Sequence, residues 1–210
     1  MFIALEGIDN TGKSTLSLGV KRYLEGQGTK VRLVADPPKE RPWGMWKDEI
    51  QGSPYIGTPA RATLFLAGRL DAVERVIKPA LEDRDIVVAD RYYASWFAYQ
   101  ITKLQKRKMS RKAAFDLLYS IHSSLEHAGL IVQPDRVYLL TGDPRILAER
   151  GKSKSGSVYD EVAEQATIQK NFLWVTNKLL RDRTKVVNVD TKSADEVCKF
   201  VCRDLARFID

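Results

Sequence analysis

Apolar residues form short runs along the chain, separated by polar or glycine-rich segments. The runs lie at residues 1–5, 31–35, 85–89, 136–140 and 185–189. Each has the length of a strand, and the third is a continuous β-branched stretch of the kind that parallel sheets bury on both faces. Between the runs, apolar residues recur at intervals of three and four, which is typical of helices that bury one face.

The alternation of these strands and helices predicts an α/β fold. Helices are expected at residues 13–27, 45–51, 58–81, 92–105, 110–128, 144–150 and 159–180. A final helix opens with a capping box formed by Ser193 and Glu196. Helices between strands imply a five-stranded parallel sheet with helices on both faces, a three-layer α/β/α arrangement. No linker divides the chain, so we expect one domain over residues 1–210.

A glycine loop joins the first predicted strand to the first predicted helix. Residues 7–14 read G-I-D-N-T-G-K-S and match the phosphate-binding template G-x-x-x-x-G-K-[ST] at every fixed position. The glycines allow backbone N–H groups to surround an anion, and the following helix adds positive charge at its N-terminus. A chance glycine turn is the alternative, but strand, loop and helix together favour a nucleotide site. Its predicted residues are Gly7, Asn10, Thr11, Gly12, Lys13, Ser14 and Thr15.

Within this loop, Lys13 is expected to reach the β- and γ-phosphates of ATP, and the Ser14 hydroxyl can ligate Mg²⁺. ATP and Mg²⁺ are therefore the expected cofactors. The proline-rich segment 36–44 follows the second predicted strand. It lies at the carboxyl edge of the sheet, where open α/β sheets bind ligands.

The chain is basic, with a formal net charge of +7 over 210 residues. This charge suits a protein that handles polyanions, and nucleotides suffice to explain it. Basic residues concentrate at 103–112, between two predicted helices. Nucleic-acid binding is one interpretation of such a run, but a solvated corner between helices is its commoner meaning, so nucleic acid is not the expected partner.

Several other classes of protein fit the sequence poorly. No apolar run approaches the roughly 20 residues that span a bilayer, and no signal-like segment precedes the first strand, so we expect a cytoplasmic protein without a membrane partner. Cys198 and Cys202 are expected to stay reduced, since a single pair does not make a disulfide framework. His122 and His127 lie on a helix without metal-ligand neighbours and are not expected to act as ligands or catalysts.

The phosphate loop alone does not identify the reaction. A GTPase would need an N-K-x-D motif after a later strand, which the chain lacks, and a D-x-x-G switch where it has D-R-Y. Instead, Arg41, Arg69 and Arg91 lie in or just after segments that are expected at the carboxyl edge. An enzyme that phosphorylates a phosphate must screen two anions from each other, and arginine forks do this bidentately.

Three segments together resemble the thymidylate kinase family, and the resemblance covers nearly the whole chain. They are F-I-A-L-E-G-I-D with G-K-S-T at 2–15, L-F-L-A-G-R at 64–69, and D-R-Y-Y-A-S with A-Y-Q at 90–100. The resemblance implies a kinase with the fold of nucleoside monophosphate kinases, which transfers the γ-phosphoryl group of ATP to dTMP and yields dTDP. It also implies a homodimer.

The resemblance further implies roles for individual residues. Asp9 would bind the sugar 3′-hydroxyl of the acceptor, while Arg91 and Arg41 would hold its phosphate. Asp90 would lie near Mg²⁺ and its waters, as would Ser14. The residues expected around the base and sugar are Phe65, Arg69, Ser95, Trp96, Tyr99 and Gln100.

Each of these residues also has a purely structural interpretation. Phe65 stacks on the pyrimidine in the functional interpretation but could be an ordinary core residue, and Tyr99, which would disfavour ribonucleotides, could be a packed tyrosine. Asp90 could cap the next helix. Arg69, expected at the carbonyl edge of the base, and Arg91 could be partners in surface salt bridges.

The chain departs from the family pattern in three places. Trp96 stands beside the base where a small or polar residue is usual, so it either reshapes the base pocket or points into the core. Ala35 stands where an arginine is common. The loop lacks an arginine, so a cation in the predicted lid, about residues 150–158, should stabilise the transferring phosphoryl group. The candidates are Arg150, Lys152 and Lys154.

Two other functions remain open from the sequence. The first is a kinase of the same fold with another acceptor: a different deoxynucleotide, a modified pyrimidine nucleotide or a deoxynucleoside. A nucleoside kinase would want a carboxylate base, for which Glu6 or Asp36 could serve. The second is a non-catalytic regulator that binds nucleotides or nucleic acid.

Overall fold

The computed structural model describes residues 1–40, 42–53, 56–151 and 162–208. Within them, five strands form one sheet in the order β2-β3-β1-β4-β5, and every neighbouring pair is parallel. The predicted fold class is therefore confirmed. The strands are β1 (Phe2–Gly7), β2 (Val31–Ala35), β3 (Ile86–Asp90), β4 (Arg136–Thr141) and β5 (Thr184–Asn188).

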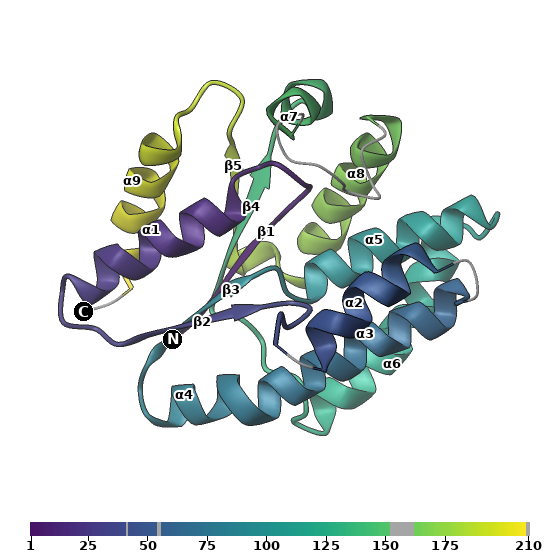
Figure 1. Cartoon of the computed structure of the whole chain (residues 1–210), viewed down its shortest axis with the longest axis horizontal. Coiled ribbons are helices and arrows are strands. Elements are labelled where there is room, and N and C mark those ends of the chain that lie inside the picture. Colours follow the sequence, from purple (N-terminus) through teal and green to yellow (C-terminus); the bar gives the residue numbers. More distant parts are fainter. Residues whose placement is uncertain (41, 54–55, 152–161, 209–210) are drawn as a thin grey trace.

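Helices cover both faces of this sheet (Figure 1). On one face α1 (Lys13–Glu25) packs beside α9 (Ala194–Leu205). On the other, α5 (Tyr93–Lys106) packs against α6 (Arg111–His127), α8 (Val162–Leu179) and α3 (Thr58–Ala72), and α2 (Trp43–Gly52) packs on α3. A short helix, α7 (Pro144–Gly151), follows β4, and a 3₁₀ turn (Arg181–Arg183) precedes β5.

The core lies where the hydrophobic pattern predicts it. Every residue of β1 is buried, because this strand is central in the sheet and carries helices on both faces. The edge strands β2 and β5 are more exposed to solvent, and Leu33 of β2 and Val186 of β5 are exposed side chains. The capping box is also confirmed: Ser193 Oγ accepts from the Glu196 N–H, and the Glu196 carboxylate accepts from the Ser193 N–H at 2.7 Å.

One predicted helix is interrupted. Residues 58–81 were expected to form a continuous helix, but a π-helical turn, Val73–Ile77, separates α3 from α4 (Lys78–Glu82). The N–H of Lys78 donates to the Val73 carbonyl, five residues back. Pro79 follows and has no N–H to donate, so the widened turn accommodates a residue that cannot continue the α-helical pattern.

No helix in the described ranges is long and apolar enough to cross a membrane. The carboxyl ends of all five strands meet at one edge of the sheet, and the glycine loop follows β1 there. The loop, the end of β3 and the segment after β5 are thus brought together, although they lie far apart in the sequence.

Candidate active site

The glycine loop turns sharply where β1 ends. Gly7 has φ +141°, and a Cβ atom there would lie 2.3 Å from the carbonyl oxygen of Leu140 on β4. Only glycine fits this position, because a side chain would both strain the backbone and collide with the neighbouring strand. The chain then reaches Lys13 at the first turn of α1, so the loop precedes a helix N-terminus as the sequence predicts.

Lys13 is folded back over the loop it belongs to. Its Nζ donates to the carbonyl of Ile8 at 2.6 Å and to Thr11 Oγ1 at 3.2 Å, and the side chain is buried. Burial, with the positive charge of Arg91, lowers the pKa of Lys13 to about 7, although Asp9 and other carboxylates oppose the shift. An anion entering the loop would stabilise the charged ammonium, so the site is poised for phosphate.

Ser14 and Asp90 connect the loop to the end of β3. Ser14 Oγ donates to Asp90 Oδ2 at 2.5 Å. A hydroxyl and a carboxylate at the same edge of the sheet are the oxygen donors that Mg²⁺ prefers when it also binds substrate phosphates. Their chemistry therefore fits the predicted metal site. Among the residues described, no cluster of three or more His, Cys, Asp or Glu side chains could hold a metal by itself.

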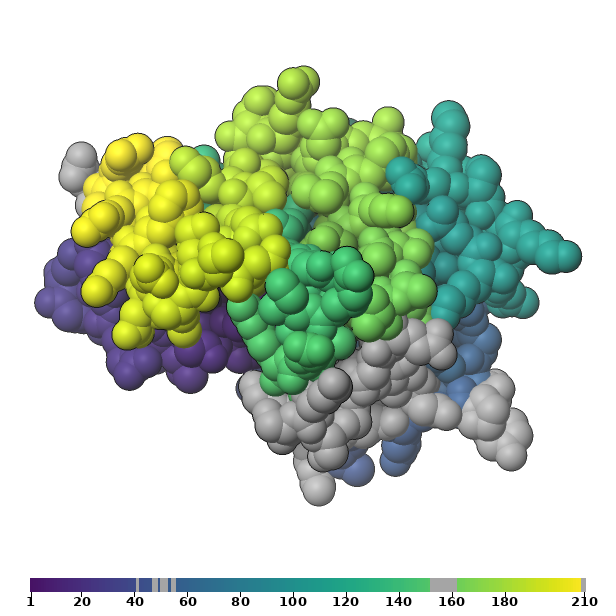
Figure 2. Space-filling model, turned by 90° about the horizontal axis from the view of Figure 1, so that it is seen from above, coloured from purple at the N-terminus to yellow at the C-terminus, as the bar shows by residue number. Residues whose placement is uncertain are grey.

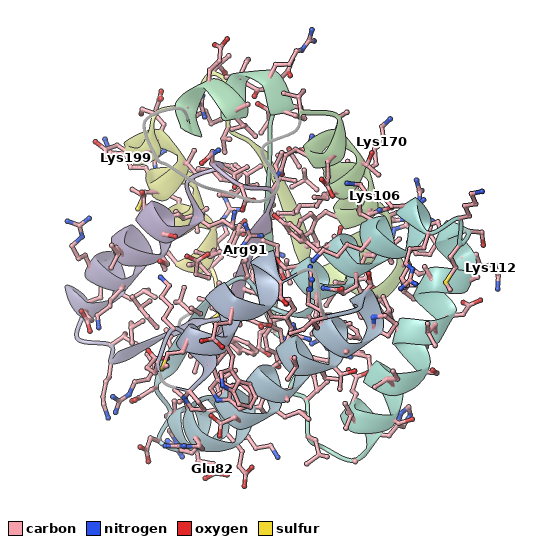
Figure 3. The ribbon with its side chains drawn as sticks, turned by 45° about the vertical axis from the view of Figure 1, so that its right-hand side comes forward. Glu82, Arg91, Lys106, Lys112, Lys170 and Lys199 are labelled. Atoms are coloured by element: carbon pink, nitrogen blue, oxygen red, sulfur yellow. The ribbon has the colours of Figure 1, made fainter. Side chains whose placement is uncertain are left out.

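Arg91 lies near the middle of the molecule (Figure 3) and has a strained backbone, with φ +72°. Its guanidinium donates to the carbonyl of Gly7 at 2.9 Å, to Ser95 Oγ at 3.4 Å and to the carboxylate of Asp9. It also lies 5.2 Å above the Tyr99 ring. The structure thus brings together residues that the sequence assigned to the acceptor, and it pairs two of them with each other.

Glu6 lies beneath this group as the last residue of β1 before Gly7. Its carboxylate accepts from the backbone N–H of Tyr92 at 3.0 Å and from the Ser95 hydroxyl. Burial raises the pKa of Glu6 to about 7, although the Ser95 hydrogen bond and the charge of Arg91 favour the ionised form. The sequence suggested Glu6 only as a base for a nucleoside kinase.

Arg69 of α3 is buried and lies against the ring of Tyr92, the residue after Arg91. Its Nε donates to Asp36 Oδ2 at 2.5 Å, and its guanidinium lies between the rings of Tyr92 and Trp96 at 5.4 and 5.6 Å. Trp96 Nε1 donates to the carbonyl of Ala62 at 2.9 Å. The tryptophan that departs from the family pattern is therefore buried and lies against Arg69, the residue expected at the base edge.

The remaining residues expected around base and sugar differ in exposure. Phe65 is half-buried and packs against the core from α3, and Tyr99 packs edge-on against Phe172 of α8 at 6.0 Å. Gln100 is buried, and its Oε1 has no hydrogen-bond partner within the described residues.

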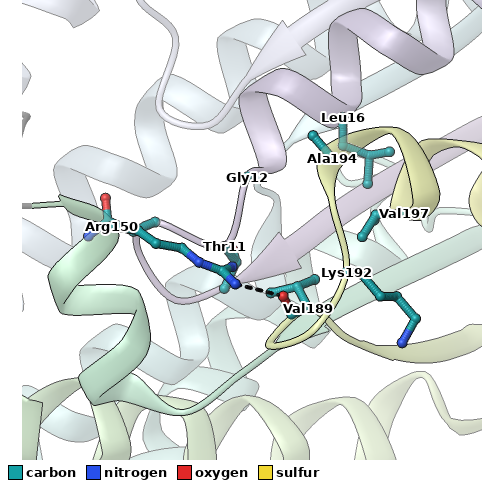
Figure 4. A pocket seen from close by; sticks show the side chains of 9 residues that line it. Thr11, Gly12, Leu16, Arg150, Val189, Lys192, Ala194 and Val197 are labelled. Carbon is teal, nitrogen blue, oxygen red and sulfur yellow. Dashed lines mark hydrogen bonds between the residues drawn. The ribbon is translucent and has the colours of Figure 1, made fainter.

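A cavity of about 330 Å³ opens beside the glycine loop (Figure 4). Arg150 of α7 donates to the carbonyls of Val189 and Asp190 at 3.1 and 2.8 Å, which connects α7 to the segment after β5. The cavity has apolar walls with a few polar groups, as nucleotide-base sites usually have. It is lined by Asn10, Thr11, Gly12, Leu16, Arg150, Val189, Lys192, Ala194 and Val197.

The start of the predicted lid lies directly against the glycine loop. A Cβ atom on Gly151 would lie 2.2 Å from the Asn10 side chain, so the end of α7 approaches the loop very closely. Viewed from above, α7 lies between the segment after β5 and α8 (Figure 2). Arg41, Lys152, Lys154 and the lid beyond Gly151 lie outside the described residues.

One polar residue of the site was missed by the sequence. Gln165 of α8 is buried, and its Nε2 donates to Asp9 Oδ2 at 3.3 Å. The connection spans 156 residues of sequence, and nothing local distinguishes Gln165 from other polar positions on a long helix. Only the packing of α8 against α5 brings it to the loop.

The basic run at 103–112 begins in the last turn of α5 and ends in the first turn of α6. Lys106 and Lys112 are at the periphery of the molecule (Figure 3). Lys106 pairs with Glu164 at 2.8 Å, Lys112 pairs with Asp116 at 2.6 Å, and Arg111 lies 5.9 Å from the Trp174 ring. Lys103, at the start of the run, is half-buried instead, and this burial lowers its pKa to about 8.

The chain is similar to known proteins over most of its length. A family model described as thymidylate kinase matches residues 5–200. A probable thymidylate kinase of Thermococcus kodakarensis is 33% identical over 184 residues, covering 82% of each chain. The thymidylate kinase of Bifidobacterium longum is 31% identical over 79% of this chain and 81% of its own. A probable thymidylate kinase of Methanocorpusculum labreanum is 31% identical over 93% and 92%.

Proposed function

Because the chain belongs to the thymidylate kinase family, we propose that it transfers the γ-phosphoryl group of Mg·ATP to the 5′-phosphate of dTMP, giving dTDP. The observation that carries the proposal is the meeting of two anion sites at one edge of the sheet. One is the glycine loop with Lys13, and the other is the guanidinium of Arg91 beside Asp9. A kinase whose acceptor already bears a phosphate needs both.

On the donor side, the backbone of the loop and Lys13 bind the β- and γ-phosphates of ATP. The Lys13 ammonium exchanges its contacts with Ile8 and Thr11 for phosphate oxygens, which restores its full charge. Ser14 and Asp90 would hold Mg²⁺, which would supply positive charge that screens the phosphates. The adenine occupies the cavity beside Arg150.

On the acceptor side, Arg91 holds the 5′-phosphate of dTMP, and Asp9 accepts the sugar 3′-hydroxyl. Phe65, Arg69 and Trp96 surround the base. The acceptor phosphate oxygen is already a nucleophile, so no strong general base is needed. Catalysis then consists of positioning and charge stabilisation, with both anions held in line.

The lid residues complete the proposal. Arg150, Lys152 or Lys154 supplies positive charge to the transferring group, and closure of residues 150–158 excludes water and suppresses ATP hydrolysis. Arg41, which follows the second strand, is the second clamp on the acceptor phosphate. Arg150 has a second role in this proposal, because its hydrogen bonds to Val189 and Asp190 hold α7 beside the cavity that would bind adenine.

The experiment is an ATP-consumption assay against a panel of acceptors: dTMP, dUMP, dCMP, dGMP, UMP, thymidine and a 5-substituted dUMP. We expect dTMP to give the highest kcat/KM. Preference for another monophosphate would keep the mechanism and assign the choice of base to Trp96. Activity with thymidine alone would contradict the role of Arg91 as a phosphate ligand. No turnover, with steeply salt-dependent DNA binding, would favour the regulator.

A homodimer is the remaining part of the proposal. Leu117 and Ile121 are exposed and lie four residues apart on α6, so they present apolar surface on the same face of that helix. Light scattering coupled to size exclusion measures the mass directly, and a mass equal to one chain would exclude the dimer.

A further inference from the structure

The turn between β3 and α5 holds Arg91 in a conformation that an arginine rarely adopts. Its φ of +72° lies in the left-handed region, where side chains other than glycine are strained. Strain of this kind persists only when the surrounding structure fixes the backbone. One anchor is the N–H of Arg91 itself, which donates to the carbonyl of Leu5 at 2.9 Å.

Glu6 fixes the same turn through two further hydrogen bonds, one to the backbone and one to a side chain. One carboxylate oxygen accepts from the backbone N–H of Tyr92, the residue after Arg91, at 3.0 Å. The other accepts from the hydroxyl of Ser95, one helical turn further on. Glu6 is only 1% exposed, and β1, on which it lies, is the central strand of the sheet. It is therefore a rigid support for the turn.

The Ser95 hydroxyl connects the Glu6 carboxylate to the guanidinium of Arg91. A hydroxyl has one hydrogen to donate, and Ser95 gives it to Glu6, so its oxygen lone pairs stay available. Arg91 Nη1 donates to that oxygen at 3.4 Å. The chain of hydrogen bonds thus runs from Arg91 to Ser95 to Glu6. Without the carboxylate, the Ser95 hydrogen could turn toward Arg91 and repel its N–H groups.

We propose that Glu6 is the positioning residue for the acceptor-phosphate arginine: it fixes the backbone of Arg91 through Tyr92 and its guanidinium through Ser95. The inference rests on the proposed function, in which Arg91 holds the phosphate of dTMP. Glu6 does not act as a base, because both of its oxygens are occupied and its side chain is closed off from the substrate space.

The test is steady-state kinetics of Glu6→Ala, Glu6→Gln and Ser95→Ala. The concentrations of dTMP and ATP are varied in turn at about pH 8, above the raised pKa of the Glu6 carboxyl. Glu6→Ala is expected to raise the KM for dTMP by about tenfold or more and leave the KM for ATP within about twofold. Glu6→Gln still accepts from Tyr92, so it should recover most of the loss, with a rise of about three- to fivefold.

Ser95→Ala removes the hydroxyl that connects Glu6 to the guanidinium of Arg91 and should raise the KM for dTMP by about threefold. If Glu6→Ala fails to fold, Ser95→Ala still tests the positioning of Arg91. The matched control is Asp204→Asn, which alters another buried carboxylate with arginine and tyrosine partners at the opposite edge of the sheet. This control should lose stability but keep both KM values.

Equal changes in both KM values, or a loss that follows thermal stability as in Asp204→Asn, would overturn the proposal. A second measurement does not depend on turnover: the side-chain Nε–H resonance of Arg91, assigned by its loss in Arg91→Lys, should shift in Glu6→Gln and Ser95→Ala without nucleotide. An unmoved resonance would refute the positioning role. A wild type that does not phosphorylate dTMP would instead refute the proposed function.

Discussion

Two buried carboxylates at opposite ends of the sheet, Glu6 and Asp204, have pKa values that are shifted in opposite directions. Asp204 of α9 lies at the amino end of β4, where it accepts from Arg136 at 2.6 Å and from Tyr138 at 2.8 Å. Burial opposes its ionisation, but these hydrogen bonds and the charges of Arg136 and Lys185 lower the pKa of Asp204. At the carboxyl end, burial prevails, and the pKa of Glu6 is raised to about 7.

The difference lies in what each carboxylate holds. Asp204 has cationic donors bonded directly to it, so its charge is compensated and the cluster stabilises the fold. Glu6 has a backbone N–H and a hydroxyl, and the nearest arginine contacts it only through Ser95. A buried group whose charge is left partly uncompensated costs stability, and proteins accept that cost where function requires the arrangement.

The largest effect should come from Lys13, at the carboxyl edge. Lys13→Met removes the ammonium that we propose binds the donor phosphates, and it should lower kcat with dTMP by about 10²–10³-fold. Lys170→Met, on the exposed side of α8, is the control and should keep wild-type kcat (Figure 3). Turnover by Lys13→Met at the wild-type rate would remove the loop from the mechanism.

The raised pKa of Glu6 predicts how stability changes with pH. The folded state holds the Glu6 proton more tightly than the unfolded chain, whose value is 4.5, so this stabilisation is complete below pH 4.5 and disappears as the pH rises through about 7. Glu6→Gln cannot ionise. The free energy of unfolding of Glu6→Gln, relative to that of the wild type, should therefore increase by about 2–3 kcal/mol when the pH is raised from acidic values to pH 8. Urea denaturation measures both free energies. A constant difference would contradict the shift.

Asp204 should show the opposite sign. Its lowered pKa means that its contribution is present above the unfolded value of 3.8 and is lost as the pH falls through the folded pKa. Asp204→Asn should therefore lose about 1.5–3 kcal/mol of unfolding free energy at neutral pH, and the gap to wild type should narrow in acid. If the difference in unfolding free energy between wild type and Asp204→Asn persists at the lowest pH where the protein folds, the lost stability comes from packing and not from the charge of Asp204.

The smallest effect should come from Arg150. Arg150→Ala removes two hydrogen bonds to the segment after β5 and one side of the cavity. The KM for ATP should rise about fivefold, while the KM for dTMP stays within about twofold. A larger change in the KM for dTMP than in that for ATP would place Arg150 on the acceptor side instead.

The fold could be predicted because its determinants are local. Five apolar runs, alternating helical patterns and one capping box suffice for a parallel sheet with helices on both faces. The phosphate loop is local too, since its glycines, Lys13 and Ser14 fall within eight residues of sequence. The interruption at Val73–Ile77 was missed because the apolar spacing continues across a π-helical turn almost unchanged.

The partners within the site could not be predicted in the same way. Glu6 lies 89 residues from Ser95, Asp36 lies 33 residues from Arg69, and Gln165 lies 156 residues from Asp9. No periodicity encodes such contacts, because they depend on strand order and on how α3, α5 and α8 pack. Trp96 illustrates the limit: the sequence left both of its orientations open, and packing places it against Arg69.

The most direct test of the contrast between the two edges is to measure Glu6→Gln and Asp204→Asn side by side, for both the KM for dTMP and the free energy of unfolding at about pH 8. The account predicts that Glu6→Gln raises the KM without losing stability, while Asp204→Asn loses stability without raising the KM. If the two variants change both quantities in parallel, the two carboxylates have the same role and the account is wrong.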